Sequence, residues 1–336
     1  MRRHMLALIC GLACLVGVPS IAALADIHGA GFVDLSLTDP VEGGPMPAFV
    51  FFPGKSSGGP TGLGPYTVDA ARGAEPAPGS YPLIVFSHGT GGSRLNHHDS
   101  LTALARAGFV AAAVEHPRDN FRDDSGFGTD LQLIGRPHHI VRLIDGVLAD
   151  ALAGPLVDRT RIGMAGHSIG GYTALLIAGA VPNFDLGAAY RQAQPNDPLL
   201  RRADGAGRER RKPGLAFVSD PRVRAIFLMA PAVGYVFDRT SLAKVDVPVR
   251  LYRPSADEQL RHPWNAERIA ELLPRPPEYQ VIDRAGHYVF LAPCPWTMAW
   301  RIPEICKDPP GIDRAAIHER LNAEMIDFFR TTLRAK

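Results

Sequence analysis

The chain has 336 residues, 46% of them hydrophobic and 8% aromatic, which is enough for one large globular domain or two ordinary ones. Its 36 basic and 34 acidic residues nearly balance, so charge predicts neither nucleic-acid binding nor an acidic tail. Four cysteines in a chain of this length exclude a disulfide-dense miniprotein.

Residues 1–25 have the pattern of a secretory signal peptide. Arg2 and Arg3 precede the apolar stretch 5–18, and the small residues at 23–25 fit a cleavage site. The stretch is shorter than the roughly 20 residues of a spanning helix, so no stable membrane anchor is expected. An uncleaved anchor or a buried N-terminal helix is the alternative. We expect a periplasmic or secreted protein, exported by the general or the twin-arginine route.

Cleavage would also remove two of the four cysteines and leave 34 basic and 34 acidic residues. The remaining pair, Cys294 and Cys306, is expected to form a disulfide in an oxidising compartment, worth about 3 kcal/mol. Two free thiols are the alternative. The spacing of this pair, with no histidine pair nearby, is not that of a zinc site, and we expect no metal and no cofactor.

The order of the apolar segments predicts the fold class. Strands are expected at 31–37, 47–52, 83–87, 109–115, 161–165, 225–230, 247–252 and 279–282. Helices are expected at 101–107, 137–153, 169–180, 265–273 and 313–330, and an irregular loop at 53–82. Buried strands that alternate with helices predict an α/β fold, with a mostly parallel central sheet and helices on both faces.

Residues 182–221 interrupt this alternation. The segment is rich in arginine, glycine and proline, and we interpret it as a cap inserted into a single domain of residues 26–336. A solvated surface loop fits the pattern equally well. Its arginines could steer an anionic substrate or keep the loop solvated.

The strongest motif is Gly166-His-Ser168-Ile-Gly170, which matches G-x-S-x-G. A predicted strand leads into it and a predicted helix follows it, which is the arrangement that exposes a nucleophilic serine on a sharp turn at the edge of an α/β sheet. The alternative is an ordinary strand–helix junction with an N-capping serine. We predict that Ser168 is a catalytic nucleophile.

A serine nucleophile needs a base to take its proton and an acid to orient that base. His287 follows the last predicted strand in a glycine-containing loop, where the base is expected. Asp257 follows the preceding strand and is the favoured acid. Glu258, beside it, is the main competitor, and Asp246 lies before that strand.

An acyl-transfer site also needs hydrogen-bond donors for the oxyanion. One is expected to be the backbone N–H of Ile169, directly after the predicted nucleophile. The second is expected from the loop 88–92, His-Gly-Thr-Gly-Gly, which follows an early strand. By analogy with H-G-G-G loops, we assign it to the N–H of Thr90. A simple glycine turn is the alternative.

Two further groups of residues have weaker patterns. Trp264, Trp296 and Trp300 could line an acyl pocket, although core packing is the simpler interpretation. The adjacent pairs His97-His98 and His138-His139 diverge on a helix, so surface or capping positions are expected rather than metal ligation.

Several of these segments resemble one bacterial family. Tyr81-Pro-Leu-Ile-Val-Phe-Ser-His-Gly89, Gly166-His-Ser-Ile-Gly-Gly-Tyr172 and Ala285-Gly-His287 resemble the "predicted dienelactone hydrolase" group of the α/β-hydrolase superfamily, which is similar to platelet-activating-factor acetylhydrolases. The tail from Cys306-Lys-Asp-Pro-Pro-Gly-Ile-Asp-Arg314 onward is similar too. True dienelactone hydrolases use a cysteine nucleophile, so the resemblance, with a serine at position 168, implies an α/β-hydrolase fold and a serine esterase.

The expected function is an exported serine hydrolase that cleaves a small-molecule or polymeric carboxylic ester. One alternative is a peptidase or amidase with the same three residues. A catalytically inactive binding module on the same fold is another. Which ester is cleaved depends on pocket walls that the sequence does not define.

Overall fold

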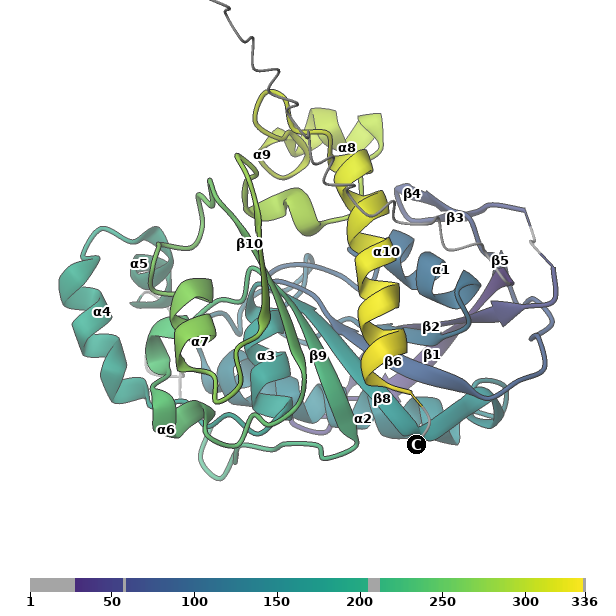
Figure 1. The fold of residues 1–336 in the computed structure, drawn as a ribbon, viewed down its shortest axis with the longest axis horizontal. Helices are drawn as coiled ribbons and strands as arrows, with labels where there is room; N and C mark the ends of the chain where they lie inside the picture. Colours follow the sequence, from purple (N-terminus) through teal and green to yellow (C-terminus); the bar gives the residue numbers. More distant parts are fainter. Residues whose placement is uncertain (1–27, 57–58, 205–211, 335–336) are drawn as a thin grey trace, which may run out of the picture.

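The structure is a computed structural model that describes residues 28–56, 59–204 and 212–334. The expected signal peptide lies outside these residues. A nine-stranded sheet runs through the molecule (Figure 1). In spatial order its strands are β11 (Glu278–Ile282), β10 (Val249–Pro254), β9 (Val223–Met229), β8 (Val157–His167), β6 (Tyr81–Ser87), β7 (Val110–Val114), β2 (Pro45–Gly54), β1 (Gly29–Thr38) and β5 (Ala71–Arg72).

The sheet is mostly parallel, as expected. The six strands from β11 to β7 run parallel to one another, whereas β2 is antiparallel to both β7 and β1. Carboxyl ends of parallel strands meet at one edge of a sheet, where α/β proteins place their ligand sites. This edge is therefore where the predicted catalytic residues should meet.

Helices cover both faces of the sheet, because its central strands are apolar on both sides. On β6, Leu83 and Val85 pack into one core, while Ile84 and Phe86 pack into the other. Helices α2 (Arg136–Ala149), α3 (Ile169–Ile177) and α7 (Ala266–Leu272) contribute to the first core. The second core contains residues of α1 (His98–Arg106) and α10 (Arg314–Thr332). Each large apolar side chain buried here contributes about 1.5–3 kcal/mol.

The predicted elements agree with the structure except where the elements are short. The expected loop 53–82 contains the hairpin β3 (Thr61–Leu63) and β4 (Tyr66–Val68), and also β5. Helix α2 ends earlier than predicted because the backbone of Asp150 is extended. The Asp150 side chain accepts hydrogen bonds from the backbone N–H groups of Leu152 and Ala153. Not predicted were α6 (Arg239–Leu242), α8 (Trp296–Arg301) and α9 (Pro303–Cys306), each too short for periodicity to reveal.

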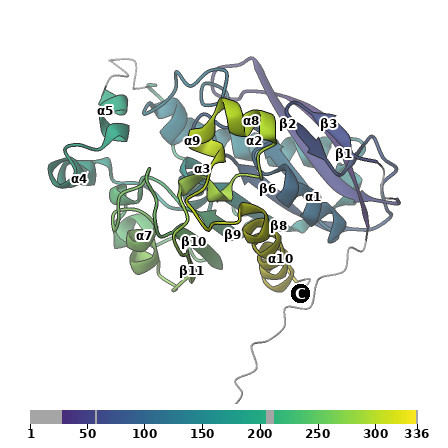
Figure 2. The same ribbon diagram turned by 90° about the horizontal axis from the view of Figure 1, so that it is seen from above.

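The segment 182–221 forms two short helices in its described part. These are α4 (Gly187–Ala193) and α5 (Pro198–Asp204), which lie to one side of the sheet in both views (Figures 1 and 2). None of the helices within the described residues is long and apolar enough to cross a membrane.

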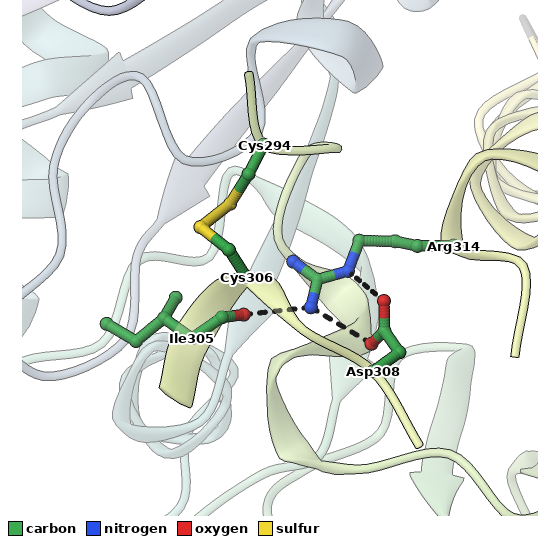
Figure 3. The surroundings of a disulfide bond; sticks show 5 residues. All are labelled: Cys294, Ile305, Cys306, Asp308 and Arg314. Carbon is green, nitrogen blue, oxygen red and sulfur yellow. Dashed lines mark hydrogen bonds and ion pairs between the residues drawn. A yellow bond between two sulfur atoms is a disulfide. The ribbon is translucent and has the colours of Figure 1, made fainter. Parts of the chain in front are cut away.

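The expected disulfide between Cys294 and Cys306 is present and closes the segment that carries α8 and α9 (Figure 3). Arg314, at the start of α10, ties this segment to the domain. Its guanidinium donates to both carboxylate oxygens of Asp308, at 2.8 and 2.9 Å, and to the carbonyl oxygen of Ile305. The disulfide and this ion pair therefore hold α9 against the rest of the chain.

Candidate active site

Ser168 lies on a tight turn between β8 and α3. Its backbone φ is +55°, a conformation that non-glycine residues rarely adopt. The flanking glycines are required by space: a Cβ on Gly166 would come within 2.1 Å of the carbonyl oxygen of Gly170. A Cβ on Gly170 would lie 1.9 Å from the carbonyl oxygen of Ser87 on β6. The motif therefore forms the strained turn that was predicted for a serine nucleophile.

The sheet register brings the other predicted residues to the same edge. Asp257 follows the end of β10 and His287 follows the end of β11, which are neighbouring parallel strands. His287 starts a short 3-10 helix, His287–Phe290. Residues thirty positions apart in sequence thus become adjacent.

His287 and Asp257 form a buried pair. Nδ1 of His287 lies 2.9 Å from Oδ2 of Asp257, and the two side chains are 4% and 2% exposed. Burial by itself would raise the pKa of the Asp257 carboxyl, but the charge and hydrogen bond of His287, with two backbone amides, lower it below its usual range. The carboxylate is therefore ionised at neutral pH and can only accept, so the imidazole proton belongs on Nδ1 and Nε2 is the free acceptor.

Glu258, the competing acid, has a different contact. Its Oε2 accepts a hydrogen bond of 2.9 Å from the backbone N–H of His287, and it does not reach the imidazole. Two backbone amides explain the difference: those of Gln259 and Leu260 donate to Oδ1 of Asp257, at 2.9 and 2.8 Å, and leave its Oδ2 for the histidine. Asp246 lies before β10 and forms an exposed ion pair with Arg275.

The predicted oxyanion donors lie beside the serine. A Cβ on Gly89 would be 3.3 Å from the Cβ of Ser168, so the loop 88–92 passes directly against the turn. Within the described residues, no hydrogen bond occupies the backbone N–H of Thr90 or of Ile169. Both residues line the same cleft as Ser168 and His287. Two unoccupied amides next to a serine are what an oxyanion hole requires.

The serine and the histidine are not hydrogen-bonded to each other. Among the described residues, Ser168 has no side-chain hydrogen-bond partner, although it and His287 line one cleft. Catalytic hydrogen bonds are often long or misaligned without a substrate and tighten when one binds. The arrangement therefore leaves the hydroxyl within a cleft that also contains His287.

The cleft is large, with a volume of about 2010 Å³. Part of its wall comes from the segment 182–221, including Phe184, Tyr190 and Phe217. Another part comes from Met298, Ile302 and Ile305, in the segment that the disulfide closes. The described part of 182–221 thus forms part of the cleft wall, and its interpretation as a cap stays a prediction.

Two sequence interpretations are wrong. Trp296 and Trp300 are 82% and 81% exposed, so they are not core residues, and neither they nor Trp264 line the cleft. In their helix, α8, Met298 is the residue that packs against the core, and the two tryptophans lie on the face in solvent. His139 is neither a surface nor a capping residue, because it lies within α2 and is 2% exposed. His97 occupies the N-cap position of α1, which agrees with the capping alternative, and it is also 2% exposed.

The lowered pKa values of five buried histidines predict that the folded protein becomes less stable as pH falls. Burial lowers the pKa of each below its usual range, and that of His97 falls to about 4; the others are His88, His116, His139 and His167. Below pH 6.5 the unfolded chain binds more protons than the folded chain, so the unfolding free energy decreases as pH falls, by up to about 1.4 kcal/mol per pH unit for each histidine. Urea unfolding between pH 7.5 and 4.5 should show this loss beginning near pH 6.5.

A His97→Met variant is the control for this effect, since methionine has similar bulk and binds no proton. Its unfolding free energy should depend less steeply on pH. Stability that stays constant from pH 6.5 down to pH 4.5 would contradict the assignment.

Sequence reasoning missed three polar residues that lie behind the loop 88–92: Asp119, Gln132 and Arg136. All are at most 3% exposed. No signal in the sequence marks them. Arg136 directly follows the π-helical turn Leu131–Gly135, so it lies inside a continuous helical segment, and its partner Asp119 comes from an earlier loop.

Comparisons with known proteins agree with this geometry. Residues 60–131 match the family described as "Platelet-activating factor acetylhydrolase, isoform II", over a segment that includes β6, the loop 88–92 and β7. A solved ferulic acid esterase from Streptomyces cinnamoneus has a TM-score of 0.62 and 20% identity, covering 94% of this chain and 93% of that one. The chain therefore has the α/β-hydrolase fold, and these matches support its resemblance to the platelet-activating-factor-acetylhydrolase-like group of that superfamily.

Proposed function

We propose that this protein is a serine hydrolase that cleaves carboxylic esters through an acyl-enzyme. The observation that carries the proposal is the pairing of His287 with the buried, ionised Asp257 in the wall of a cleft that also exposes Ser168. The match to an acetylhydrolase family and the fold shared with a ferulic acid esterase support ester chemistry. Ser168, His287 and Asp257 would act as nucleophile, base and orienting acid.

In the acylation step, Nε2 of His287 takes the hydroxyl proton of Ser168 as the oxygen attacks the ester carbonyl. The carbonyl oxygen becomes an oxyanion, which the N–H groups of Thr90 and Ile169 stabilise. The imidazolium, stabilised by the Asp257 carboxylate, then gives its proton to the leaving alcohol as the ester C–O bond breaks. Water repeats the sequence on the acyl-enzyme, with the same histidine as base, and releases the acid.

The cleft favours a bulky, neutral substrate. Its volume of about 2010 Å³ exceeds the 300–1,000 Å³ of a typical small-molecule site, and its lining includes aromatic side chains from several segments. The basic residues that line it each form an ion pair, as in Arg94 with Asp34, Arg122 with Glu115, and Lys212 with Glu42. Paired charges attract an anion only weakly, so steering of an acidic substrate is not favoured.

We also propose that the protein acts outside the cytoplasm. The sequence of residues 1–25 has the pattern of an export signal, and the disulfide between Cys294 and Cys306 suits an oxidising compartment. Export would deliver the enzyme to esters in the surroundings of the cell.

The test is covalent labelling combined with a choice of substrates. A fluorophosphonate probe should label the wild-type protein at Ser168, identified by peptide mass. The p-nitrophenyl ester of a carboxylic acid should be hydrolysed far faster than the p-nitroanilide of the same acid, because p-nitrophenolate leaves without a proton whereas the anilide nitrogen must be protonated by His287 as its C–N bond breaks. Equal rates would indicate an amidase, and an absence of labelling would indicate a binding module.

A further inference from the structure

The loop 88–92, called the oxyanion loop below, needs contacts with the rest of the protein to keep its conformation. Thr90 stands between Gly89 and Gly91, and the φ of Gly91 is +63°. Glycines lack the Cβ that restricts other residues, so the backbone dihedral angles beside Thr90 are only weakly restricted. Within the loop, the carbonyl oxygen of Gly89 accepts a hydrogen bond of 3.1 Å from the N–H of Gly92 and lies 2.7 Å from Nδ1 of His88. If the peptide before Thr90 turned over, it would present a carbonyl oxygen instead of an N–H to the oxyanion.

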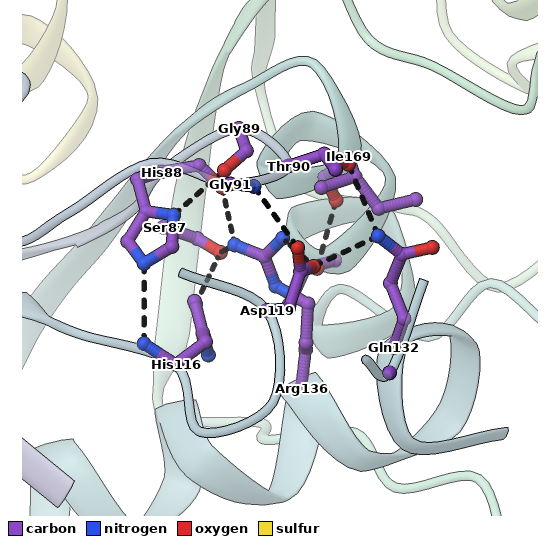
Figure 4. Close-up of polar contacts among 12 residues, drawn as sticks. Ser87, His88, Gly89, Thr90, Gly91, His116, Asp119, Gln132, Arg136 and Ile169 are labelled. Atoms are coloured by element: carbon purple, nitrogen blue, oxygen red, sulfur yellow. Dashed lines mark hydrogen bonds and ion pairs between the residues drawn. The ribbon is translucent and has the colours of Figure 1, made fainter. Parts of the chain in front are cut away.

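Three hydrogen bonds fix this loop from behind (Figure 4). The backbone N–H of Gly91 donates to Oδ1 of Asp119, at 3.1 Å. Nε2 of Gln132 donates to the hydroxyl oxygen of Thr90, at 3.0 Å. A guanidinium N–H of Arg136 donates to the carbonyl oxygen of His88. The loop is therefore held before, at and after the residue that supplies the oxyanion donor.

The three residues behind the loop are joined to one another. Oδ2 of Asp119 accepts from Nε2 of Gln132 at 2.8 Å and from Nη1 of Arg136 at 2.9 Å. Arg136 is fully buried and Asp119 is 1% exposed, so their ion pair is shielded from solvent. A shielded, multiply hydrogen-bonded group keeps its geometry far better than an exposed one. Gln132 connects this rigid pair to Thr90.

We infer that Gln132, Asp119 and Arg136 are positioning residues that hold the Thr90 amide in the orientation that receives the oxyanion. The inference rests on the proposed function, because it assigns a role to that same site. None of the three touches the reacting atoms. Their effect should fall on the tetrahedral transition state, where the oxyanion forms, and hardly on the ground-state complex.

The bond between Gln132 and Thr90 is the place to test this. Substitutions at Asp119 or Arg136 would leave a buried charge without its partner and would unfold the protein. Gln132→Met keeps the bulk of the side chain and removes its donors. Thr90→Val keeps the shape of the loop residue, removes the acceptor of the same bond, and leaves Gln132 and the buried ion pair intact. Gln280→Met, on the exposed face of the edge strand β11, is the matched control.

Three quantities should be measured for these variants and the double variant: kcat and KM for p-nitrophenyl butyrate, and the inhibition constant of a trifluoromethyl ketone, which forms a tetrahedral adduct. Each single variant should lower kcat about 10-fold or more, since loss of a whole oxyanion donor costs about 100- to 1,000-fold. KM should change less than about 3-fold, and ketone affinity should weaken by the same factor as kcat. Thr90→Val removes only the bond to Gln132, whereas Gln132→Met also removes the bonds of Gln132 to Asp119 and to the backbone N–H of Gly128. The double variant should therefore resemble Gln132→Met, because the bond to Thr90 is already lost in that variant.

Two results would overturn the inference while leaving the proposed function intact: an active wild type whose Gln132→Met and Thr90→Val variants keep the kcat of Gln280→Met, or losses that multiply in the double variant. A wild type that neither hydrolyses the ester nor reacts with the fluorophosphonate would overturn both. Urea unfolding of each variant shows whether a loss of activity follows from lower stability. If Gln132→Met is destabilised, Thr90→Val provides the test of the inference, because it leaves Gln132, Asp119 and Arg136 in place.

Discussion

Ser168→Ala should lower kcat for p-nitrophenyl esters by about 10⁴-fold or more, with little change in KM. Removing the nucleophile of such a site leaves only binding and the oxyanion donors, which retain a small part of the rate enhancement. The side chain is small and has no hydrogen-bond partner among the described residues, so the unfolding free energy should change by less than about 1 kcal/mol. Initial rates, active-site titration and urea unfolding measure these quantities.

Ser36→Ala provides the matched control, because Ser36 is an exposed serine on β1, far in the sheet order from β8. It should keep full activity and fluorophosphonate labelling. Ser168→Ala should lose the labelling together with the activity. If Ser168→Ala retained more than a few per cent of the wild-type kcat, the nucleophile assignment would be wrong.

Asp257→Asn and Glu258→Gln should have very different effects, although the residues are adjacent. An asparagine amide can donate to Nδ1 of His287 and stabilise the wrong tautomer, so kcat should decrease by about 10³- to 10⁴-fold, as in serine hydrolases whose triad acid is changed this way. Glu258 contacts only the backbone N–H of His287, and a glutamine oxygen still accepts that bond. Glu258→Gln should therefore cost less than about 10-fold.

The pH dependence of kcat/KM provides a second way to distinguish the variants Asp257→Asn and Glu258→Gln. Glu258→Gln should keep the wild-type profile, in which activity decreases toward acid pH because the base must be neutral. Asp257→Asn should change the profile, since the charge that stabilises the imidazolium is lost. A larger loss of activity in Glu258→Gln than in Asp257→Asn would assign the acid to Glu258.

The choice between these two acids shows where sequence reasoning ends. The expected chain order of serine, acid and histidine predicts that an acid follows β10, but Asp257 and Glu258 both meet that description. The backbone amides of Gln259 and Leu260 hold one oxygen of Asp257 and leave the other for His287, which favours Asp257 as the acid. Such a turn depends on loop conformation, which no period in the sequence encodes.

The buried histidines and the exposed tryptophans show that burial, too, cannot be predicted reliably from residue type. Residue type predicts a surface or capping position for His97 and core packing for Trp296, but His97 is buried at the N-cap of α1 and Trp296 is 82% exposed. His97 is buried because elements distant in the chain cover it. Trp296 is exposed because its helix packs against the core through Met298 and leaves the tryptophan in solvent. Burial is a property of the assembled elements, so single-residue preferences fail wherever the packing departs from the average.

The features that depend on local structure were predictable from the amino-acid sequence alone. Alternating apolar runs indicated a mostly parallel sheet, and G-x-S-x-G between a strand and a helix indicated the turn at Ser168, since its glycines are required by contacts within and next to the motif. The features that depend on long-range contacts were decided by the tertiary structure: the contact of His287 with Asp257, the size of the cleft, and the support of the oxyanion loop by Asp119, Gln132 and Arg136. Hydrogen bonds between segments far apart in the chain form only when the folded sheet brings those segments together. A single sequence does not specify the distances between such segments.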